Sequence, residues 1–291
     1  MIEIDAAWIA ANPLPALDGD TDKDSRGRVL IAGGAVDVPG ALRLTGEAVL
    51  RVGAGKVRLA TVASAALGLG LAFPEAAVLA LPEADGEIGA DAADLLREHV
   101  ERAECVVLGP GMGSSAVAAG LVRAIAAVAS EATLLLDAAA VVGSAGLAEV
   151  LAPWRGRLVM TPHCGEMAGL CGCDEDAIKA DPAKIAREIA DRFGAVVVLK
   201  DAETLIAAPE GGTLHYAGGG PGLGTGGSGD VLAGAIAGLL ARGAAPVVAA
   251  GWGVWLHGSA GRRLAADVGT IGFLGRELLP LLPVTLAQDP G

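Results

Sequence analysis

Short runs of apolar residues alternate along the chain with longer segments that have the spacing of helices. Six runs have the length and nearly continuous apolar character of strands that a parallel sheet buries on both faces; they occupy residues 27–34, 55–61, 104–111, 133–139, 157–163 and 195–200. Between them, residues 40–53, 114–130 and 182–194 show helical length and period. This order predicts an α/β fold with a mostly parallel central sheet between layers of helices.

Two later segments differ from this alternation. Residues 203–217 form two short apolar runs around Pro-Glu-Gly-Gly, which predicts a β-hairpin. Residues 231–258 raise the question of a membrane span, but Arg242, Gly243 and Pro246 divide them into pieces shorter than the roughly 20 residues that a span requires. We therefore expect two buried helices joined by a turn, with Pro246 in the first turn of the second helix.

The composition is that of a single soluble α/β domain. The 291 residues are 53% hydrophobic and 19% charged, and no Ser/Pro-rich linker or block of charge divides them. A net charge of −13 with scattered Lys and Arg argues against nucleic acid as a partner, and we expect no membrane partner. Because residues 1–10 lack the basic start of a signal peptide, we expect a cytoplasmic protein with reduced thiols.

Three of the four cysteines, Cys164, Cys171 and Cys173, follow His163 closely. The Cys-x-Cys spacing lacks the two intervening residues that are usual in zinc sites. Free thiols are therefore favoured over a metal centre, and the sequence assigns no metal ligands.

Glycine, proline and polar residues follow the predicted strands, for example at 33–41, 109–113, 137–141, 161–166 and 200–204. The carboxyl ends of parallel strands meet at one edge of a sheet, and ligands of open α/β sheets bind there. We expect these segments to converge on one binding rim.

The glycine-rich segment 222–230 fits neither of the two common phosphate-binding motifs. Gly222, Gly224 and Gly227 match Gly-x-Gly-x-x-Gly, but the dinucleotide fingerprint also needs an acidic residue about 20 positions later, and none is present there. A P-loop needs Gly-Lys-Ser/Thr, whereas Ser228 follows Gly227 directly.

Residues 226–230, Gly-Gly-Ser-Gly-Asp, instead have the character of a helix start that binds an anion, because unpaired N–H groups and a partial positive charge lie there. Asp230 then has two interpretations. It is either the N-cap of the helix or a base that takes the proton of an attacking hydroxyl while the amides stabilise a transferred phosphoryl group. The residues alone support both.

Gly-Gly-Ser-Gly-Asp before a small apolar helix resembles the anion-hole and catalytic-aspartate motif of the ribokinase-like superfamily. With residues 27–61, 106–113, 158–166, 196–207 and 255–261, in this order, the chain resembles the ADP- or ATP-dependent NAD(P)H-hydrate dehydratases from about Gly27 to Leu282. The resemblance implies a ribokinase-like three-layer sandwich in a single domain, residues 27–291, preceded by a lead-in segment, residues 1–26.

The resemblance also implies an activity: a lyase of metabolite repair that returns the S epimer of hydrated NADH or NADPH to the intact cofactor, with ADP or ATP as phosphoryl donor and Mg²⁺. Hydroxide is a poor leaving group because water has a pKa of about 15.7. Phosphate, whose second pKa is about 6, leaves readily. Phosphorylation of the C6 hydroxyl therefore makes elimination feasible.

The family pattern assigns roles to particular residues. Asp230 matches the base, and the anion hole matches Gly227, Ser228 and Gly229. Positions that contact the nucleotide match Lys200, Asp201, Ala202, Glu203, Thr204 and Gly229. Positions that contact the hydrated cofactor match Ala41, Gly111, His163 and Asp230. Without the resemblance, His163 is a local hydrogen-bonding group at a strand end, Lys200 a solvated strand terminus and Glu166 a first-turn helix carboxylate.

The chain departs from the usual family residues at several places. Asp201 replaces a glycine and adds a carboxylate beside the nucleotide positions, and Cys164 replaces the second proline of Pro-His-Pro-Gly-Glu. Gly220 stands where the family has asparagine, and 137–141 also differs from the family's Asp-Ala-Asp/Gly-Ala-Leu.

Two other functions stay open at this level: a superfamily kinase for a small vitamin-precursor alcohol, and a non-catalytic nucleotide-binding protein. The resemblance implies a homo-oligomer. It also implies a functional pairing with a separate NAD(P)H-hydrate epimerase, because residues 1–26 are too few to hold that domain. The sequence does not decide between ADP and ATP or between the two hydrated cofactors.

Overall fold

The computed structural model describes residues 1–16, 21–209 and 211–287. Ten strands form one sheet in the order β1-β12-β11-β10-β9-β8-β7-β2-β3-β4. Their bounds are β1 (Ile2–Glu3), β2 (Arg28–Ala32), β3 (Lys56–Val62), β4 (Ala77–Leu81), β7 (Cys105–Leu108), β8 (Thr133–Leu136), β9 (Leu158–Met160), β10 (Ala195–Lys200), β11 (Thr204–Ala207) and β12 (Thr213–Tyr216). Neighbouring strands are parallel except in the pairs β10–β11 and β11–β12. A separate antiparallel pair joins β5 (Glu83–Ala84) to β6 (Glu87–Ile88).

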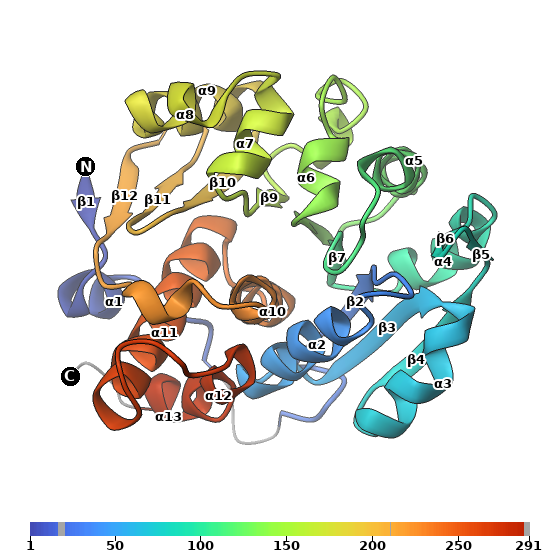
Figure 1. Cartoon of the computed structure of the whole chain (residues 1–291), viewed down its shortest axis with the longest axis horizontal. Coiled ribbons are helices and arrows are strands. Elements are labelled where there is room, and N and C mark those ends of the chain that lie inside the picture. The colour runs from blue at the N-terminus through green and yellow to red at the C-terminus, as the bar shows by residue number, and fades with distance from the viewer. Residues whose placement is uncertain (17–20, 210, 288–291) are drawn as a thin grey trace.

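Helices cover both faces of the sheet (Figure 1). Those that contribute to the core on one face are α1 (Ala6–Ala11), α2 (Gly40–Arg51), α10 (Ser228–Ala241), α11 (Pro246–Asp267), α12 (Gly275–Leu278) and α13 (Leu281–Ala287). Those that contribute to the core on the other face are α4 (Ala92–Glu101), α5 (Ser115–Ala126), α6 (Ala139–Gly143), α7 (Cys164–Cys171), α8 (Glu175–Ala180) and α9 (Pro182–Phe193). Helix α3 (Ala63–Ala72) packs against β4, and 3₁₀ turns lie at η1 (Ala152–Trp154) and η2 (Pro221–Leu223).

The nearly continuous apolar strands follow from this layering. Val29 and Ile31 of β2 belong to the core beneath α2 and α10, whereas Leu30 and Ala32 belong to the core beneath α4 and α5. Successive side chains of a strand point to opposite faces, so a strand covered on both sides must be apolar at every position.

All six strands expected from the apolar runs are present, as β2, β3, β7, β8, β9 and β10. The three expected helices are α2, α5 and α9, and the predicted hairpin is the antiparallel pair β11–β12. The apolar segment 231–258 forms most of α10 and the first half of α11, and Pro246 lies at the start of α11 as expected. In the part of the chain that the structure describes, no helix is both long and apolar enough to cross a membrane.

Residues 1–16, which the sequence assigns to a lead-in segment, take part in the sheet and core. Strand β1 pairs in parallel with β12 at the edge of the sheet, and Ile4 and Ile9 are buried. The side chain of Trp252 donates to the carbonyl of Asn12 at 2.7 Å and ties this segment to α11. A domain boundary at residue 27 stays a prediction.

Close packing of α10 on α2 fixes the position of the glycine-rich turn. A Cβ atom at Gly234 would lie 2.2 Å from the carbonyl oxygen of Thr45, so only glycine allows this approach. Helix α10 thereby passes across the sheet with its first residues beside the carboxyl end of β10, because Lys200 lies close to Gly229.

Candidate active site

The site begins at the first turn of α10. Gly227 is the N-cap, with φ +87°, a backbone conformation that favours glycine, and no side chain caps the helix. Asp230 is the third residue of the helix and not its N-cap, so the capping interpretation is wrong. Its carboxylate has no hydrogen-bond partner among the residues that the structure describes. The N–H group of Ser228 donates to the Thr225 carbonyl at 3.2 Å, whereas those of Gly229 and Asp230 have no partner among the described residues and remain available to an anion.

A buried lysine lies between three carboxylates at this turn. Lys200, the last residue of β10, places its Nζ atom 3.0 Å from Asp137 Oδ1 and 3.9 Å from Glu166 Oε2. A Cβ atom on Gly229 would lie 3.6 Å from the same Nζ. The interpretation of Lys200 as a solvated strand terminus is therefore wrong. Burial lowers the pKa of Lys200, but the negative charges of Asp137, Glu166 and Asp230 raise it by more than burial lowers it. The ammonium group therefore stays charged.

The cluster sets the protonation of Asp230. Burial, followed by the negative charge of Asp137, raises the pKa of Asp230 to about 7; Lys200 opposes this rise and Glu166 adds to it. Burial and Asp137 also raise the pKa of Glu166, although Lys200 opposes this effect. A carboxylate that changes protonation near neutral pH is suited to proton transfer.

A cavity of about 710 Å³ opens beside this cluster, and we call it the carboxyl-end cavity. Of the residues that the family pattern assigns to a site, it brings together His163, Lys200, Asp201, Ala202, Thr204, Ser228 and Gly229. Apolar contacts come from Leu223, Leu232 and Val254. A cavity of this size, with an apolar side and a charged end, matches a nucleotide better than a small ion.

Glu203 does not line the carboxyl-end cavity. Its carboxylate instead lies 2.7 Å from His215 Nε2. Hydrogen bonds to Glu3 and Glu203 raise the pKa of His215, and this effect outweighs the lowering of that pKa by burial. Its role toward a nucleotide stays a prediction.

Ala41 and Gly111 lie together on the other side of Asp137. A Cβ atom on Gly111, whose φ is +68°, would lie 2.9 Å from the Ala41 side chain and 2.6 Å from the Val38 carbonyl. A Cβ atom on Gly109 would lie 1.9 Å from the carbonyl oxygen of Asp137, so these two backbone segments are also in close contact. The strand ends therefore converge on one rim, as the sequence predicts, and Asp137 lies between the Ala41–Gly111 pair and Lys200.

His163 caps a helix. Its Nδ1 atom accepts the backbone N–H groups of Gly165 and Glu166 at 3.0 and 3.2 Å, and Glu166 Oε2 accepts the N–H of His163 at 2.9 Å. This capping box confirms the local interpretations of both side chains. The His163 side chain is still 58% exposed and lines the cavity, although its Nε2 atom lies 3.3 Å from Glu166 Oε1.

The two departures from the family pattern at Cys164 and Asp201 contact one another. The thiol of Cys164 donates to Asp201 Oδ2 at 3.4 Å, and Asp201 Oδ1 accepts the N–H of Ala202 at 2.8 Å. Burial, followed by this hydrogen bond, raises the pKa of Cys164 to about 11, so the thiol keeps the proton that it donates. Both oxygens of Asp201 are thus held within the protein.

Sequence reasoning missed His257. This residue of α11 lines the carboxyl-end cavity, and its Nε2 atom lies 2.9 Å from Ser228 Oγ. In the sequence, His257 lies in residues 255–261, a segment that resembles the family but to which the resemblance assigns no binding or catalytic role. Asp137 was also not assigned a role, although it follows a predicted strand.

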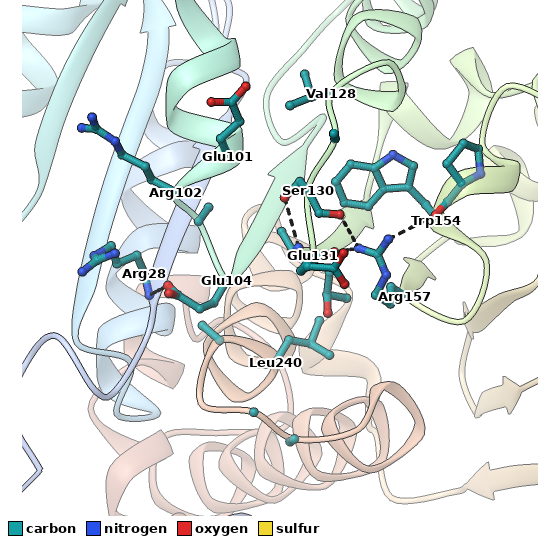
Figure 2. Close-up of a pocket in the computed structure, with 18 residues that line it drawn as sticks. Arg28, Glu101, Arg102, Glu104, Val128, Ser130, Glu131, Trp154, Arg157 and Leu240 are labelled. Carbon is teal, nitrogen blue, oxygen red and sulfur yellow. Dashed lines mark hydrogen bonds between the residues drawn. The ribbon is translucent and has the colours of Figure 1, made fainter.

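A larger hollow of about 910 Å³ lies at the opposite edge, beside the amino ends of the strands, and we call it the amino-end cavity. Figure 2 shows Arg28, Arg102 and Arg157 around it. The Arg157 guanidinium donates to the carbonyls of Ser130, Ala132 and Pro153. Asp24 pairs with the Arg28 side chain and Glu98 with that of Arg102. Because these charges are paired within the protein, this hollow indicates no ligand.

The four cysteines are free thiols. Across residues 1–16, 21–209 and 211–287, no group of three or more His, Cys, Asp or Glu side chains is arranged to hold a metal ion.

Comparison with known proteins assigns the chain to a family. The family model described as NAD(P)H-hydrate dehydratase matches residues 29–283. The chain belongs to the NAD(P)H-hydrate dehydratase family. It is 48% identical to an ADP-dependent (S)-NAD(P)H-hydrate dehydratase of Xanthomonas campestris pv. campestris, over 99% of this chain and 96% of that protein. It is 37% identical to a bifunctional NAD(P)H-hydrate repair enzyme of Moorella thermoacetica, over 97% of this chain but only 53% of that protein.

Solved structures agree with this family and with the ribokinase-like fold. A ribokinase-like superfamily protein of Enterococcus faecalis V583 has a TM-score of 0.83 and 26% identity, over 99% of this chain and 96% of that one. An ADP/ATP-dependent NAD(P)H-hydrate dehydratase of Bacillus subtilis, co-crystallised with ATP/Mg²⁺, has a TM-score of 0.81 and 25% identity, over 99% of this chain and 98% of that one. The α/β, ribokinase-like prediction is confirmed.

Proposed function

We propose that this chain is a nucleotide-dependent dehydratase that returns the S epimer of hydrated NADH or NADPH to the intact cofactor. Family membership and the name of the Xanthomonas relative support the reaction. The observation that carries the mechanism is Asp230, an unpaired carboxylate with a pKa of about 7 in the first turn of α10, beside Lys200 and the anion-binding amides.

In the proposed first step, Asp230 takes the proton of the C6 hydroxyl while that oxygen attacks the terminal phosphoryl group of ADP or ATP. The bond from phosphorus to the nucleotide breaks, and the anion hole of Gly227, Ser228 and Gly229 stabilises the charge on the phosphoryl oxygens. In the second step the ring nitrogen expels phosphate from C6, and loss of a C5 proton restores the dihydropyridine. The Lys200 ammonium lies where it can offset phosphoryl charge.

The nucleotide binds in the carboxyl-end cavity in this proposal. Its phosphates face Lys200 and the start of α10, and its apolar base faces Leu223, Leu232 and Val254. The hydrated cofactor approaches from Ala41 and Gly111, on the far side of Asp137. In this proposal the two reactants approach from opposite sides of Asp137.

The residues fit a magnesium ion of the kind that nucleotides carry. Mg²⁺ keeps several waters and is usually held by one or two carboxylates together with phosphates of the substrate. Glu166, only 15% exposed and beside Lys200, is the carboxylate that would hold it through one of those waters, because both of its oxygens already contact His163. Bound Mg²⁺ would supply positive charge at the transferred phosphoryl group.

The chain spans about half the length of its bifunctional relatives. The bifunctional name of the Moorella relative supports a functional pairing with NAD(P)H-hydrate epimerase. We propose that this enzyme is a homo-oligomer that acts directly on one epimer.

Asp230→Asn tests the mechanism. We expect normal folding and normal affinity for ADP but turnover lowered by about 10²–10⁴-fold, because general-base assistance is lost. Turnover is measured as the return of dihydronicotinamide absorbance when hydrated NADH is mixed with enzyme, ADP or ATP, and Mg²⁺. Near-parental turnover by the variant would exclude Asp230 as the base.

The same variant has a second, independent readout in its stability. An unfolded Asp ionises near 3.8, whereas folded Asp230 ionises at about 7, so the parent loses stability as the pH rises between these values. Asp230→Asn should therefore melt at a higher temperature than the parent at pH 8, and the difference should disappear by pH 4. A lower melting temperature at pH 8 would contradict the raised pKa.

A further inference from the structure

His257 and Ser228 form a buried polar pair beneath the first turn of α10. Ser228 is 4% exposed and His257 is 8% exposed, and the two side chains meet at 2.9 Å between Oγ and Nε2. Helices α10 and α11 are otherwise packed with apolar side chains such as Leu232 and Val254. Burial of polar groups in such surroundings is unfavourable unless they are hydrogen-bonded, so the pair requires an explanation beyond packing.

The imidazole of His257 is neutral at ordinary pH. Burial lowers the pKa of His257 to about 4. The charge of Lys200 also lowers this pKa, whereas a hydrogen bond with the Ser228 backbone raises it. A neutral ring has one N–H and one bare nitrogen. Both hydrogen-bond contacts of the ring are with Ser228, one with its Oγ atom and one with its backbone, so Ser228 is the residue that selects the tautomer.

A count of protons decides which way this hydrogen bond runs when a phosphoryl group is bound. Phosphoryl oxygens only accept hydrogen bonds, and the Ser228 hydroxyl has a single proton. If Nε2 accepted that proton, the hydroxyl could offer the phosphoryl group only lone pairs, which repel it. If Nε2–H donates to Oγ instead, the hydroxyl proton is free to point into the carboxyl-end cavity.

We propose that His257 is a positioning residue for the anion hole: its Nε2–H donates to Ser228 Oγ and so directs the hydroxyl proton toward the transferred phosphoryl group. The proposal rests on the proposed function, in which Ser228 belongs to the anion hole. It predicts that His257 acts on turnover only through Ser228, without contact with the reacting atoms.

The test compares four variants with the parent: His257→Gln, His257→Leu, Ser228→Ala and the double variant His257→Leu/Ser228→Ala. The amide nitrogen of Gln can occupy the place of Nε2 and donate to Oγ, whereas Leu cannot donate. For each protein we would measure kcat and KM with hydrated NADH, the Kd for ADP and the melting temperature. The parent is assayed first, because its failure to turn over hydrated NADH would refute the proposed function and not the role of His257.

We expect Ser228→Ala to lower kcat by about 10²-fold, the loss typical of one anion-hole donor. His257→Leu should lower kcat at least tenfold with KM and Kd changed less than threefold, and His257→Gln should recover most of that loss. The double variant should be no slower than Ser228→Ala, because both changes remove the same hydrogen bond.

The proposal would be overturned by losses that multiply in the double variant, by a Gln variant as slow as the Leu variant at an equal melting temperature, or by parental kcat in Ser228→Ala. A Leu variant that is only less stable, with parental kcat below its melting temperature, would assign His257 to packing alone and would also overturn it.

Discussion

Three carboxylates share one lysine at the carboxyl-end cavity, and this imbalance determines the pH at which Asp230 ionises. With Asp137, Glu166 and Asp230 all ionised around Lys200, the cluster would carry two excess negative charges inside the protein. Like charges in a poorly solvated site disfavour simultaneous ionisation. No described group donates a hydrogen bond to the Asp230 carboxylate, and burial with the charge of Asp137 raises its pKa to about 7.

Glu166→Gln should shift the pH dependence of the reaction. A base must be deprotonated, so kcat/KM of the parent should fall as the pH drops through about 7. Removing the charge of Glu166 lowers the pKa of Asp230, and the acidic limb of the profile should move to lower pH even if the maximal rate also falls. Glu175→Gln is the control, because Glu175 is not among the groups that shift Asp230. A limb that stays in place in Glu166→Gln would show that Asp230 does not titrate in this profile.

Ala138, next to Asp137, has a backbone conformation that suits glycine: φ is +49° and ψ is −126°. A residue with a side chain in such a region carries strain of about 1–3 kcal/mol. Ala138→Gly should therefore keep or raise the melting temperature, despite the greater flexibility of glycine in the unfolded chain. Ala139→Gly, one position later in α6 where no positive φ occurs, should lower it, because glycine costs about 0.5–1 kcal/mol within a helix. Equal losses in both variants would contradict the strained conformation.

At the scale of elements, the contact of α10 with α2 positions the first turn of α10. Gly234→Ala would place a Cβ atom 2.2 Å from the Thr45 carbonyl and 2.7 Å from the Ala48 side chain. Overpacking of this kind costs about 1–3 kcal/mol. We expect Gly234→Ala to lower both the melting temperature and kcat, because α10 must move and carries Asp230 with it.

Gly120→Ala is the matched control for this prediction. Gly120 lies within α5, and nothing is within 4 Å of a Cβ atom at that position. The same change should there raise stability by about 0.5–1 kcal/mol through helix propensity. If Gly234→Ala behaved like Gly120→Ala, the two helices would not be in the close contact described.

The sequence predicts those elements whose burial leaves a local pattern. Strands β2, β3, β7, β8, β9 and β10 are apolar on both faces, and their six runs were sufficient to place them. Strand β4 is at the sheet edge and half exposed, so its short run was less distinctive. Strands β1, β5 and β6 are two residues long and exist only through their partners, which no local pattern reveals.

The same limit applies to the site. The sequence predicts the helix start at the glycine-rich turn and singles out Asp230, because the five residues that indicate an anion-binding helix start are adjacent. Lys200 and Asp137 are 63 positions apart, and Ser228 and His257 are 29 apart. Their pairing follows from the order of strands in the sheet and from the crossing of α10 and α11. Composition and periodicity contain no information on either.

At the scale of the whole molecule, the enzyme is an acidic protein that handles acidic ligands. The net charge is −13, and Lys200 and Lys179 line the carboxyl-end cavity together with Asp201 and Glu175. The two lysines and the two acidic residues of the cavity lining balance one another, so the lining does not offset the negative field of the whole protein. Binding must rely on the helix amides and on Lys200 at short range, where the solvent screens least.

We therefore expect the encounter with hydrated NADH to become faster as salt screens the protein. When the ionic strength rises from 0.02 to 0.2 M at constant Mg²⁺, the Debye length falls from roughly 20 to 7 Å, and kcat/KM should increase by about two- to tenfold while kcat changes little. Glu175→Gln, at the cavity, should weaken this salt dependence more than Glu101→Gln at the amino-end cavity, although both raise the net charge by one. Steady-state kinetics in two monovalent salts would check the prediction. A fall in kcat/KM with salt would mean that the local field of Lys200 and Lys179 attracts the substrate and outweighs the charge of the whole chain.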